Sequence, residues 1–182
     1  MKTNTSDIME IRNKITRIMN LWTILTNDVM QTLREIDSAS EGGLPFRRRT
    51  FIRTFFACVE GVCYGMRLMC DEGLALPTTY QPDAKFLQKL HEDRLSFIDA
   101  VKISFKGFAL IFRQDFTLDV ESKGYQAFFE SKEIRDKLVH PKRAVDLILS
   151  PKEIDNAVVA MKWFNDEMVR LSKCPIKLSA PK

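Results

Sequence analysis

The residues with the most chemical content lie between positions 134 and 141, where Arg135, Asp136 and His140 precede Pro141. A guanidinium group binds phosphate oxygens in a bidentate manner and keeps its positive charge at neutral pH. An imidazole can accept or donate a proton near neutral pH. Arg135 and His140 together could therefore bind and cleave a phosphodiester, and Asp136 could orient the His140 ring and raise its pKa.

The proline predicts where these side chains lie. The residue before a proline is disfavoured in the α conformation, so we expect a helix to end at His140 and the imidazole to turn toward Arg135. A second interpretation is structural. Basic side chains in the last turn of a helix bind its free carbonyl groups and favour its dipole. On that interpretation Arg135, Lys137 and His140 only terminate the helix, and Asp136 is exposed.

The order of Arg135, Asp136 and then His140, with four residues between the arginine and the histidine, resembles the motif of the HEPN superfamily. Many members of that superfamily carry arginine, then asparagine, aspartate or histidine, and then, after four to six intervening residues, a histidine toward the end of a late helix. The resemblance implies an all-α bundle that is often dimeric. It also implies a metal-independent endoribonuclease of toxin or defence type, which cleaves RNA by 2′-OH attack with no cofactor and no metal.

Other members of the superfamily keep the fold without cleaving RNA. The alternative function is therefore a non-catalytic HEPN-like module that binds nucleotide, RNA or a partner protein such as an antitoxin. HEPN-like bundles often place a polar residue of an earlier helix near the motif. Glu60, which interrupts an apolar run, is the residue we expect to support Arg135. The alternative for Glu60 is a position that faces solvent or a dimer partner.

Basic residues elsewhere could follow an RNA backbone. Four arginines crowd the start of the second predicted helix, where positive charge opposes the helix dipole and can mark an anion-binding site. The alternative is a solvated basic cluster. The candidate RNA-binding residues are Arg47, Arg48, Arg49, Arg53, Lys137, Lys142 and Arg143.

Other classes of function have no sequence support. The chain has no phosphate-binding loop, dinucleotide-binding motif or nucleophile elbow. His91 has no second histidine at a metal-binding spacing, so we expect it at the surface or at a helix cap. Three of the four cysteines lie in one apolar segment, and we expect buried thiols there and no metal site.

The elements that must position the motif are helical. Apolar residues recur every three or four positions, and glycine and proline separate the repeats. A capping box, Ser150 with Glu153, should begin the last helix. A polar turn is expected at 119–124 and a short extended segment at 145–149. The five predicted helices cover 7–37, 46–71, 84–116 with a break near His91, 125–139 and 151–173.

The composition fits this organisation. With 182 residues, of which 45% are hydrophobic and 29% charged, we expect one globular domain over 1–182, with a loose tail over about 174–182. The predicted fold class is an all-α, up-and-down bundle. No stretch approaches a bilayer span and no signal peptide is visible, so we expect a cytoplasmic protein with no membrane contact. A net charge of +4 permits an anionic partner.

Assembly is the last expectation. A two-fold axis is the commonest symmetry of protein homo-oligomers. We expect a homodimer that brings two Arg135–His140 segments into one positively charged groove, because two copies would double the cationic groups around one phosphate. Lys132, Lys137, Lys142 and Arg143 would line its rim.

Overall fold

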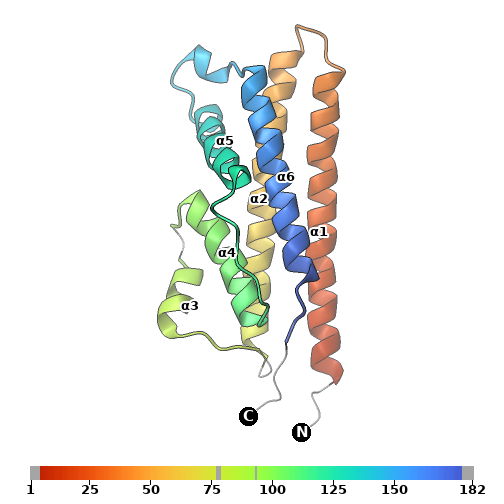
Figure 1. The fold of residues 1–182 in the computed structure, drawn as a ribbon, viewed down its shortest axis with the longest axis vertical. Helices are drawn as coiled ribbons and strands as arrows, with labels where there is room; N and C mark the ends of the chain where they lie inside the picture. Colours follow the sequence, from red (N-terminus) through yellow and green to blue (C-terminus); the bar gives the residue numbers. More distant parts are fainter. Residues whose placement is uncertain (1–4, 77–78, 93, 178–182) are drawn as a thin grey trace. The chain divides into compact units, whose positions relative to one another are not determined.

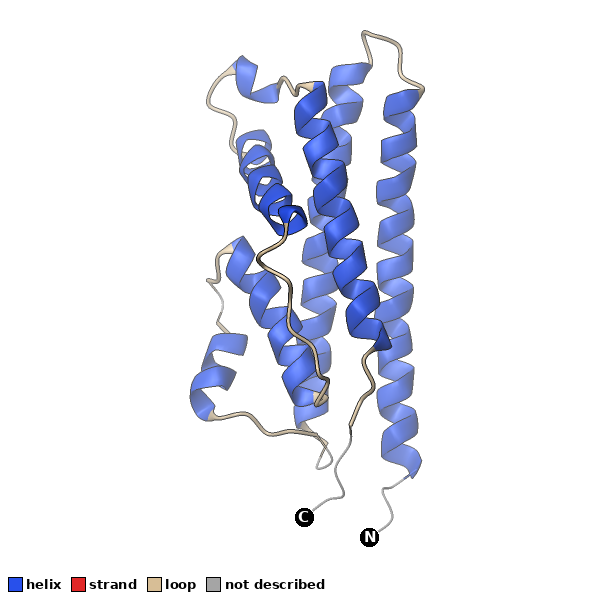
Figure 2. Ribbon diagram, viewed as in Figure 1, coloured by secondary structure: helices blue, strands red, loops and turns tan. Residues whose placement is uncertain are grey.

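The computed structural model describes residues 5–76, 79–92 and 94–177. Over these residues the chain forms helices, turns and loops and contains no strand (Figure 2). The predicted all-α fold class is therefore confirmed, and the chain is a helical bundle. The α-helices, labelled in Figure 1, are α1 (Thr5–Asp37), α2 (Leu44–Leu74), α3 (Ala84–Leu90), α4 (Phe97–Ile111), α5 (Lys123–Val139) and α6 (Pro151–Lys173). A 3-10 helix, η1 (Ala144–Leu147), lies between α5 and α6 in the sequence.

The chain divides into two compact units, each assembled from segments that are distant in sequence. The α4 unit comprises residues 1–22, 60–118 and 168–182, and the α5 unit comprises residues 23–59 and 119–167. The three long helices α1, α2 and α6 each contribute one part to each unit. The organisation of residues 1–182 as a single domain stays a prediction.

Helix boundaries follow from local capping. The predicted break near His91 is confirmed, because α3 ends at Leu90 with His91 as its C-cap, and Ser96 begins α4 by accepting the N–H of Asp99. Over the residues that the structure describes, this break yields six α-helices where five were predicted. The predicted capping box of α6 is also confirmed, since Glu153 accepts the Ser150 N–H at 2.8 Å and Ser150 Oγ accepts the Glu153 N–H at 3.3 Å.

Two expectations about loops need correction. The polar turn expected at 119–124 forms over 119–122, where Asp119 Oδ1 accepts the Glu121 and Ser122 N–H groups, and Ser122 then caps α5 by accepting the Tyr125 N–H. The expected extended segment at 145–149 begins within η1. Asp146 explains that turn, because its carboxylate accepts the backbone N–H groups of Lys142 and Arg143, each at 3.0 Å.

Aromatic side chains fill the core of the α5 unit. The ring of Phe128 on α5 lies 5.7 Å from Phe56 of α2 and 4.9 Å from Trp163 of α6, centroid to centroid. Phe128, Phe56 and Phe164 are each at most 1% exposed. These contacts fix one face of α5 against α2 and α6, so the C-terminal end of α5 is carried by a rigid element.

The cysteines lie mostly where the apolar pattern of α2 predicts. Cys58, Cys63 and Cys70 are buried thiols, and Cys174 is partly exposed. Burial raises the pKa of Cys58 to about 11 and that of Cys70 to about 12, so both stay protonated at neutral pH. Of the predicted tail, residues 174–177 are described, and the Lys177 N–H donates to the Phe112 carbonyl at 3.2 Å. The rest of the tail lies outside the described residues.

Candidate functional site

The candidate site is centred on the C-terminal end of α5. The helix ends at Val139, and His140 is its C-cap with φ −126° and ψ 60°, as Pro141 predicts. The His140 N–H still donates to the Asp136 carbonyl at 2.9 Å, whereas the His140 side chain is exposed. An imidazole in this position can exchange protons with solvent or with a bound substrate.

Arg135 precedes the last turn of α5, in which Lys137 is the basic residue. The Arg135 side chain is 24% exposed, and its Nη1 lies 3.2 Å from Asp136 Oδ1. The other carboxylate oxygen, Asp136 Oδ2, lies 2.8 Å from Lys132 Nζ, one helical turn earlier. Asp136 therefore joins two cations on the surface of α5.

The charges around Asp136 change its pKa. Partial burial of the carboxyl group acts to raise its pKa. Hydrogen bonds from Lys132 and Arg135 outweigh this effect, so the pKa of Asp136 is below its usual value. The same contact raises the pKa of Lys132, chiefly through the hydrogen bond to Asp136. Asp136 is therefore an ionised carboxylate at neutral pH.

The expected contact between Asp136 and His140 does not form in the described part of the chain. The Asp136 carboxylate bonds to Lys132 and Arg135, and the His140 ring has no hydrogen bond there. Two physical reasons explain the difference. Permanent cations attract a carboxylate more strongly than a neutral imidazole does, and His140 leaves the helical path that would align positions four residues apart.

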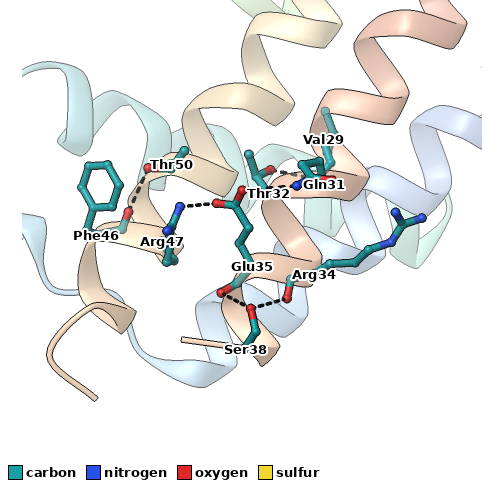
Figure 3. Close-up of polar contacts among 9 residues, drawn as sticks. All are labelled: Val29, Gln31, Thr32, Arg34, Glu35, Ser38, Phe46, Arg47 and Thr50. Atoms are coloured by element: carbon teal, nitrogen blue, oxygen red, sulfur yellow. Dashed lines mark hydrogen bonds and ion pairs between the residues drawn. The ribbon is translucent and has the colours of Figure 1, made fainter. Parts of the chain in front are cut away.

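The four arginines at the start of α2 bind oxygen atoms of this chain. Arg48 Nη1 donates to the Leu149 carbonyl at 2.8 Å, and Arg49 Nη1 donates to the Leu147 carbonyl at 3.1 Å. Arg47 forms an ion pair with Glu35, which joins α2 to α1 (Figure 3). These contacts offset the unfavourable position of positive charge at a helix N-terminus.

Arg53 connects the arginine cluster to the candidate site. Its Nη2 donates to the Leu138 carbonyl at 3.0 Å, which is one of the free carbonyl groups at the end of α5. Arg53 therefore caps the helix that carries Arg135 and His140. The sequence analysis predicted that Arg53 binds RNA. It did not consider that a guanidinium can also donate hydrogen bonds to the free carbonyl groups at a helix end.

The loop after His140 is also fixed by its own contacts. Asp146 accepts the backbone N–H groups of Lys142 and Arg143 and lies 3.3 Å from Arg143 Nη2. The Lys142 backbone hydrogen bond is the largest cause that lowers the pKa of Asp146. The side chains of Lys137, Lys142 and Arg143 are exposed, so three cationic groups surround His140 in sequence. Asp146 was not predicted as part of the site, although an acidic residue three positions after the N-cap, here Arg143, is a signal for the start of a helix.

Two other candidates lie outside this group. Glu60 is exposed on α2 and belongs to the α4 unit, whereas Arg135 belongs to the α5 unit, so their pairing stays a prediction. His91 is exposed at the end of α3, with Nε2 2.6 Å from Asp71 Oδ1, which confirms a surface and cap position.

Comparisons with family models, with curated proteins and with solved structures found no match to this chain. Among the described helices, none is long and apolar enough to cross a membrane. In the same part of the chain no cluster of histidine, cysteine or acidic residues could hold a metal ion. The arrangement at the end of α5 therefore has to be interpreted from its own chemistry.

Proposed function

We propose that this chain is a HEPN-like, metal-independent endoribonuclease that acts through Arg135 and His140. The observation that supports this function best is an exposed imidazole at the C-cap of α5 and a half-buried guanidinium five residues earlier on the same helix. A cation and a solvent-accessible proton carrier are the groups that phosphodiester cleavage uses.

The proposed reaction uses the 2′-hydroxyl of RNA as nucleophile. His140 acts as general base or acid, and in the forward step it takes the 2′-OH proton. The 2′ oxygen then bonds to phosphorus while the bond from phosphorus to the 5′ oxygen breaks and that oxygen takes up a proton. Arg135 stabilises the negative charge on the pentacovalent phosphate. The products are a 2′,3′-cyclic phosphate and a 5′-hydroxyl.

The surrounding residues have supporting roles in this proposal. Asp136 holds the Arg135 guanidinium, while Arg53 and Asp146 hold the ends of the segment that carries His140. Lys137, Lys142 and Arg143 are exposed and would contact the RNA backbone.

Cleavage of a labelled oligoribonucleotide in EDTA tests the proposal. Wild-type protein should produce cyclic-phosphate ends, and a substrate with 2′-deoxy sugars should stay intact. His140→Ala and Arg135→Ala should each lower the rate by about 100-fold or more, since these groups act in the transition state. The matched control is His91→Ala, which removes the other histidine and should leave the rate unchanged. Wild-type protein that cleaves no RNA, or a His140→Ala variant as active as wild type, contradicts the proposal.

A non-catalytic binding module is the second candidate, and one observation favours it. Asp136 and the arginines Arg47, Arg48, Arg49 and Arg53 all have partners within the chain, which is what a purely structural helix end would show. Such a module should bind RNA, nucleotide or a protein such as an antitoxin without cleaving RNA. His140→Ala would then leave binding unchanged, while Lys142→Ala would weaken RNA binding and lower its dependence on salt.

A further inference from the structure

A row of cationic side chains follows α4, in the unit that does not contain Arg135 and His140. Lys102, Lys106 and Arg113 are all exposed. They are separated by four and seven residues, so they share one side of the helix and its C-terminal end, about 6 and 10 Å apart along the axis. No acidic residue occurs between positions 100 and 114, so this side of α4 is positively charged over most of its length.

Two of these cations lie over aromatic rings. Lys106 Nζ is 5.8 Å from the centroid of the Phe86 ring, and Arg113 Cζ is 5.8 Å from the centroid of the Tyr80 ring. Tyr80 is 40% exposed. In the described part of the chain neither cation forms an ion pair or a side-chain hydrogen bond, whereas Arg48 at the start of α2 donates to a carbonyl group. Lys106 and Arg113 are therefore available to an anion from outside the chain.

Packing within the unit holds these rings beside α4. Helix α3 packs on α4 (Figure 1), and a Cβ atom at Gly107 would lie 3.0 Å from Leu90 Cδ1, so glycine allows this close approach. The Tyr80 N–H donates to the Ile111 carbonyl at 3.0 Å, which fixes Tyr80 at the end of α4. Both aromatic rings are therefore placed beside the cations by the fold.

The backbone at Arg113 supports a role for its side chain. Arg113 lies in the left-handed region at φ 51°. Its N–H donates to the Leu110 carbonyl at 3.1 Å and the Gln114 N–H donates to the Ala109 carbonyl at 2.8 Å, which is a Schellman motif at the end of α4. Glycine is the usual residue at this position, because a Cβ atom strains the left-handed conformation. A strained residue of this kind indicates a function for its side chain, which here is a cation.

The charge and the rings together indicate the class of partner. Lys85 and Lys89 are exposed on α3 and add positive charge. Asp83, the N-cap of α3, and Asp99 of α4 already accept hydrogen bonds at the N-terminal ends of these helices. Cations that alternate with exposed aromatic rings are the groups that bind single-stranded nucleic acids, through the phosphates and through stacked bases. An anionic membrane would instead require a helix with a broad apolar face that inserts into the lipid.

We propose that the α3–α4 face, formed by Lys102, Lys106, Arg113 and Tyr80, binds single-stranded nucleic acid. The cations contact phosphates, and a base stacks on the exposed part of the Tyr80 ring. This binding needs neither a 2′-hydroxyl nor cleavage, so it does not depend on the proposed nuclease chemistry at His140.

Fluorescence anisotropy of a labelled single-stranded oligodeoxynucleotide, about 20 nucleotides long, tests the proposal on the full chain. The probe lacks the 2′-hydroxyl, so the proposed nuclease reaction cannot cleave it and a failure of that reaction leaves this test intact. Wild-type protein should bind the probe about tenfold more tightly than the matching duplex, whose paired bases cannot stack on Tyr80. No binding of the single strand, or equal binding of strand and duplex, overturns the proposal.

Two variants test the cations. Lys106→Gln and Arg113→Gly should each weaken binding about fivefold at 0.1 M salt and lower the slope of log affinity against log salt by about 0.7, the loss of one phosphate contact. Arg113→Gly also suits the left-handed backbone, so it removes the guanidinium without disturbing the fold. The matched control is Arg17→Gln, on α1, which Figure 1 draws on the opposite side from α3 and α4, and it should bind as wild type. Wild-type affinity in both Lys106→Gln and Arg113→Gly overturns the proposal.

Substitutions of Tyr80 test the stacked base. Tyr80→Leu should weaken binding of the single strand about fivefold or more and leave duplex binding unchanged, whereas Tyr80→Phe keeps the ring and should bind as wild type. If Tyr80→Leu does not fold, Lys106→Gln still decides the question, because Lys106 is exposed. Vesicles that contain phosphatidylserine distinguish the other polyanion. Binding to these vesicles without binding to the oligonucleotide would make the α3–α4 face a membrane surface and overturn the proposal.

Discussion

Asp136 binds two cationic side chains near the end of α5. The motif predicted an aspartate that orients a histidine, and the structure places the carboxylate between Lys132 and Arg135. The resemblance to the HEPN motif rests on residue types and spacing. The contact that the Asp136 carboxylate makes depends instead on which cationic side chains lie close to it. In the proposed reaction Asp136 therefore acts on the arginine.

This assignment predicts a pH-dependent contribution of Asp136 to stability. Its pKa in the folded chain is below the unfolded value of about 4, so the contribution is present above pH 4 and is lost as pH falls through the folded pKa. Asp136→Asn should lower the free energy of unfolding at pH 7 by about 0.5 kcal/mol, because both ion pairs are partly exposed. Urea denaturation at pH 7 and at pH 2.5 measures the difference, which should be smaller at the lower pH.

Asp155→Asn is the control for that measurement, because Asp155 is exposed on α6 and forms no ion pair in the described part of the chain. It should leave the unfolding free energy unchanged at both values of pH. A larger effect of Asp136→Asn at pH 2.5 than at pH 7 would contradict the assignment.

The sequence predicted where the backbone of the candidate site lies, but not which groups its side chains contact. Pro141 predicts that α5 ends at His140, because a proline restricts the residue before it. The sequence did not indicate the partners of Arg48, Arg49 and Arg53, which donate to carbonyl groups 101, 98 and 85 positions later in the chain. Those contacts depend on tertiary packing, which local charge patterns do not report.

At the scale of the element, α5 depends on a cap that another helix supplies. Arg53 of α2 donates to the Leu138 carbonyl, next to the segment that carries His140. Arg53→Leu should lower the free energy of unfolding by about 1 kcal/mol, because a carbonyl group loses a charged donor. It should also speed hydrogen exchange at the His140 amide, whose bond to Asp136 belongs to the last turn.

Hydrogen exchange with mass spectrometry and thermal unfolding measure these two effects. Lys152→Leu is the matched control, because Lys152 is exposed at the start of α6 and has no hydrogen bond or ion pair in the described residues. Unchanged exchange at the end of α5 in Arg53→Leu would show that the cap does not hold this turn.

The start of α5 is restricted by close packing. A Cβ atom at Gly124 would lie 2.6 Å from Trp163 Cβ and 2.9 Å from Cγ, which real side chains do not tolerate. Gly124→Ala should therefore lower the free energy of unfolding by about 1–3 kcal/mol, because the helix must shift away from α6. Gly42→Ala is the control, since a Cβ atom there would have nothing within 4 Å and the substitution should be neutral. Denaturant unfolding of both variants measures the difference, and equal stabilities would contradict it.

The helices themselves were predictable because local rules determine them. The repeat of apolar residues gives α1, α2 and α6 within a few residues of their ends, and Ser150 with Glu153 gives the start of α6. Errors occurred where a side chain organises a loop. Asp146 makes a 3-10 turn from a segment rich in Val, Leu and Ile, residue types that favour a strand by propensity.

At the scale of the whole molecule, the question is whether two copies of the chain bring their Arg135–His140 segments together. Three apolar side chains near His140 in sequence are exposed: Val139 at 44%, Val145 at 55% and Ile148 at 68%. A large contiguous patch of exposed apolar groups can mark a protein–protein interface. The homodimer in which the two Arg135–His140 segments face each other stays a prediction, and these side chains allow it to be tested.

Ile148→Glu tests this assembly. At a two-fold interface the substitution occurs twice, so two carboxylates would lose water close to each other and the dimer should dissociate. Ile24→Glu is the matched control, because Ile24 lies on α1 of the same unit, is 60% exposed and should leave the dimer intact. Sedimentation velocity should find a wild-type dimer, an Ile148→Glu monomer and an Ile24→Glu dimer. If RNA cleavage needs both motifs, the Ile148→Glu monomer should also lose activity while keeping its fold. A wild-type monomer that cleaves RNA would separate the two proposals, since the nuclease chemistry would stand and the shared groove would not.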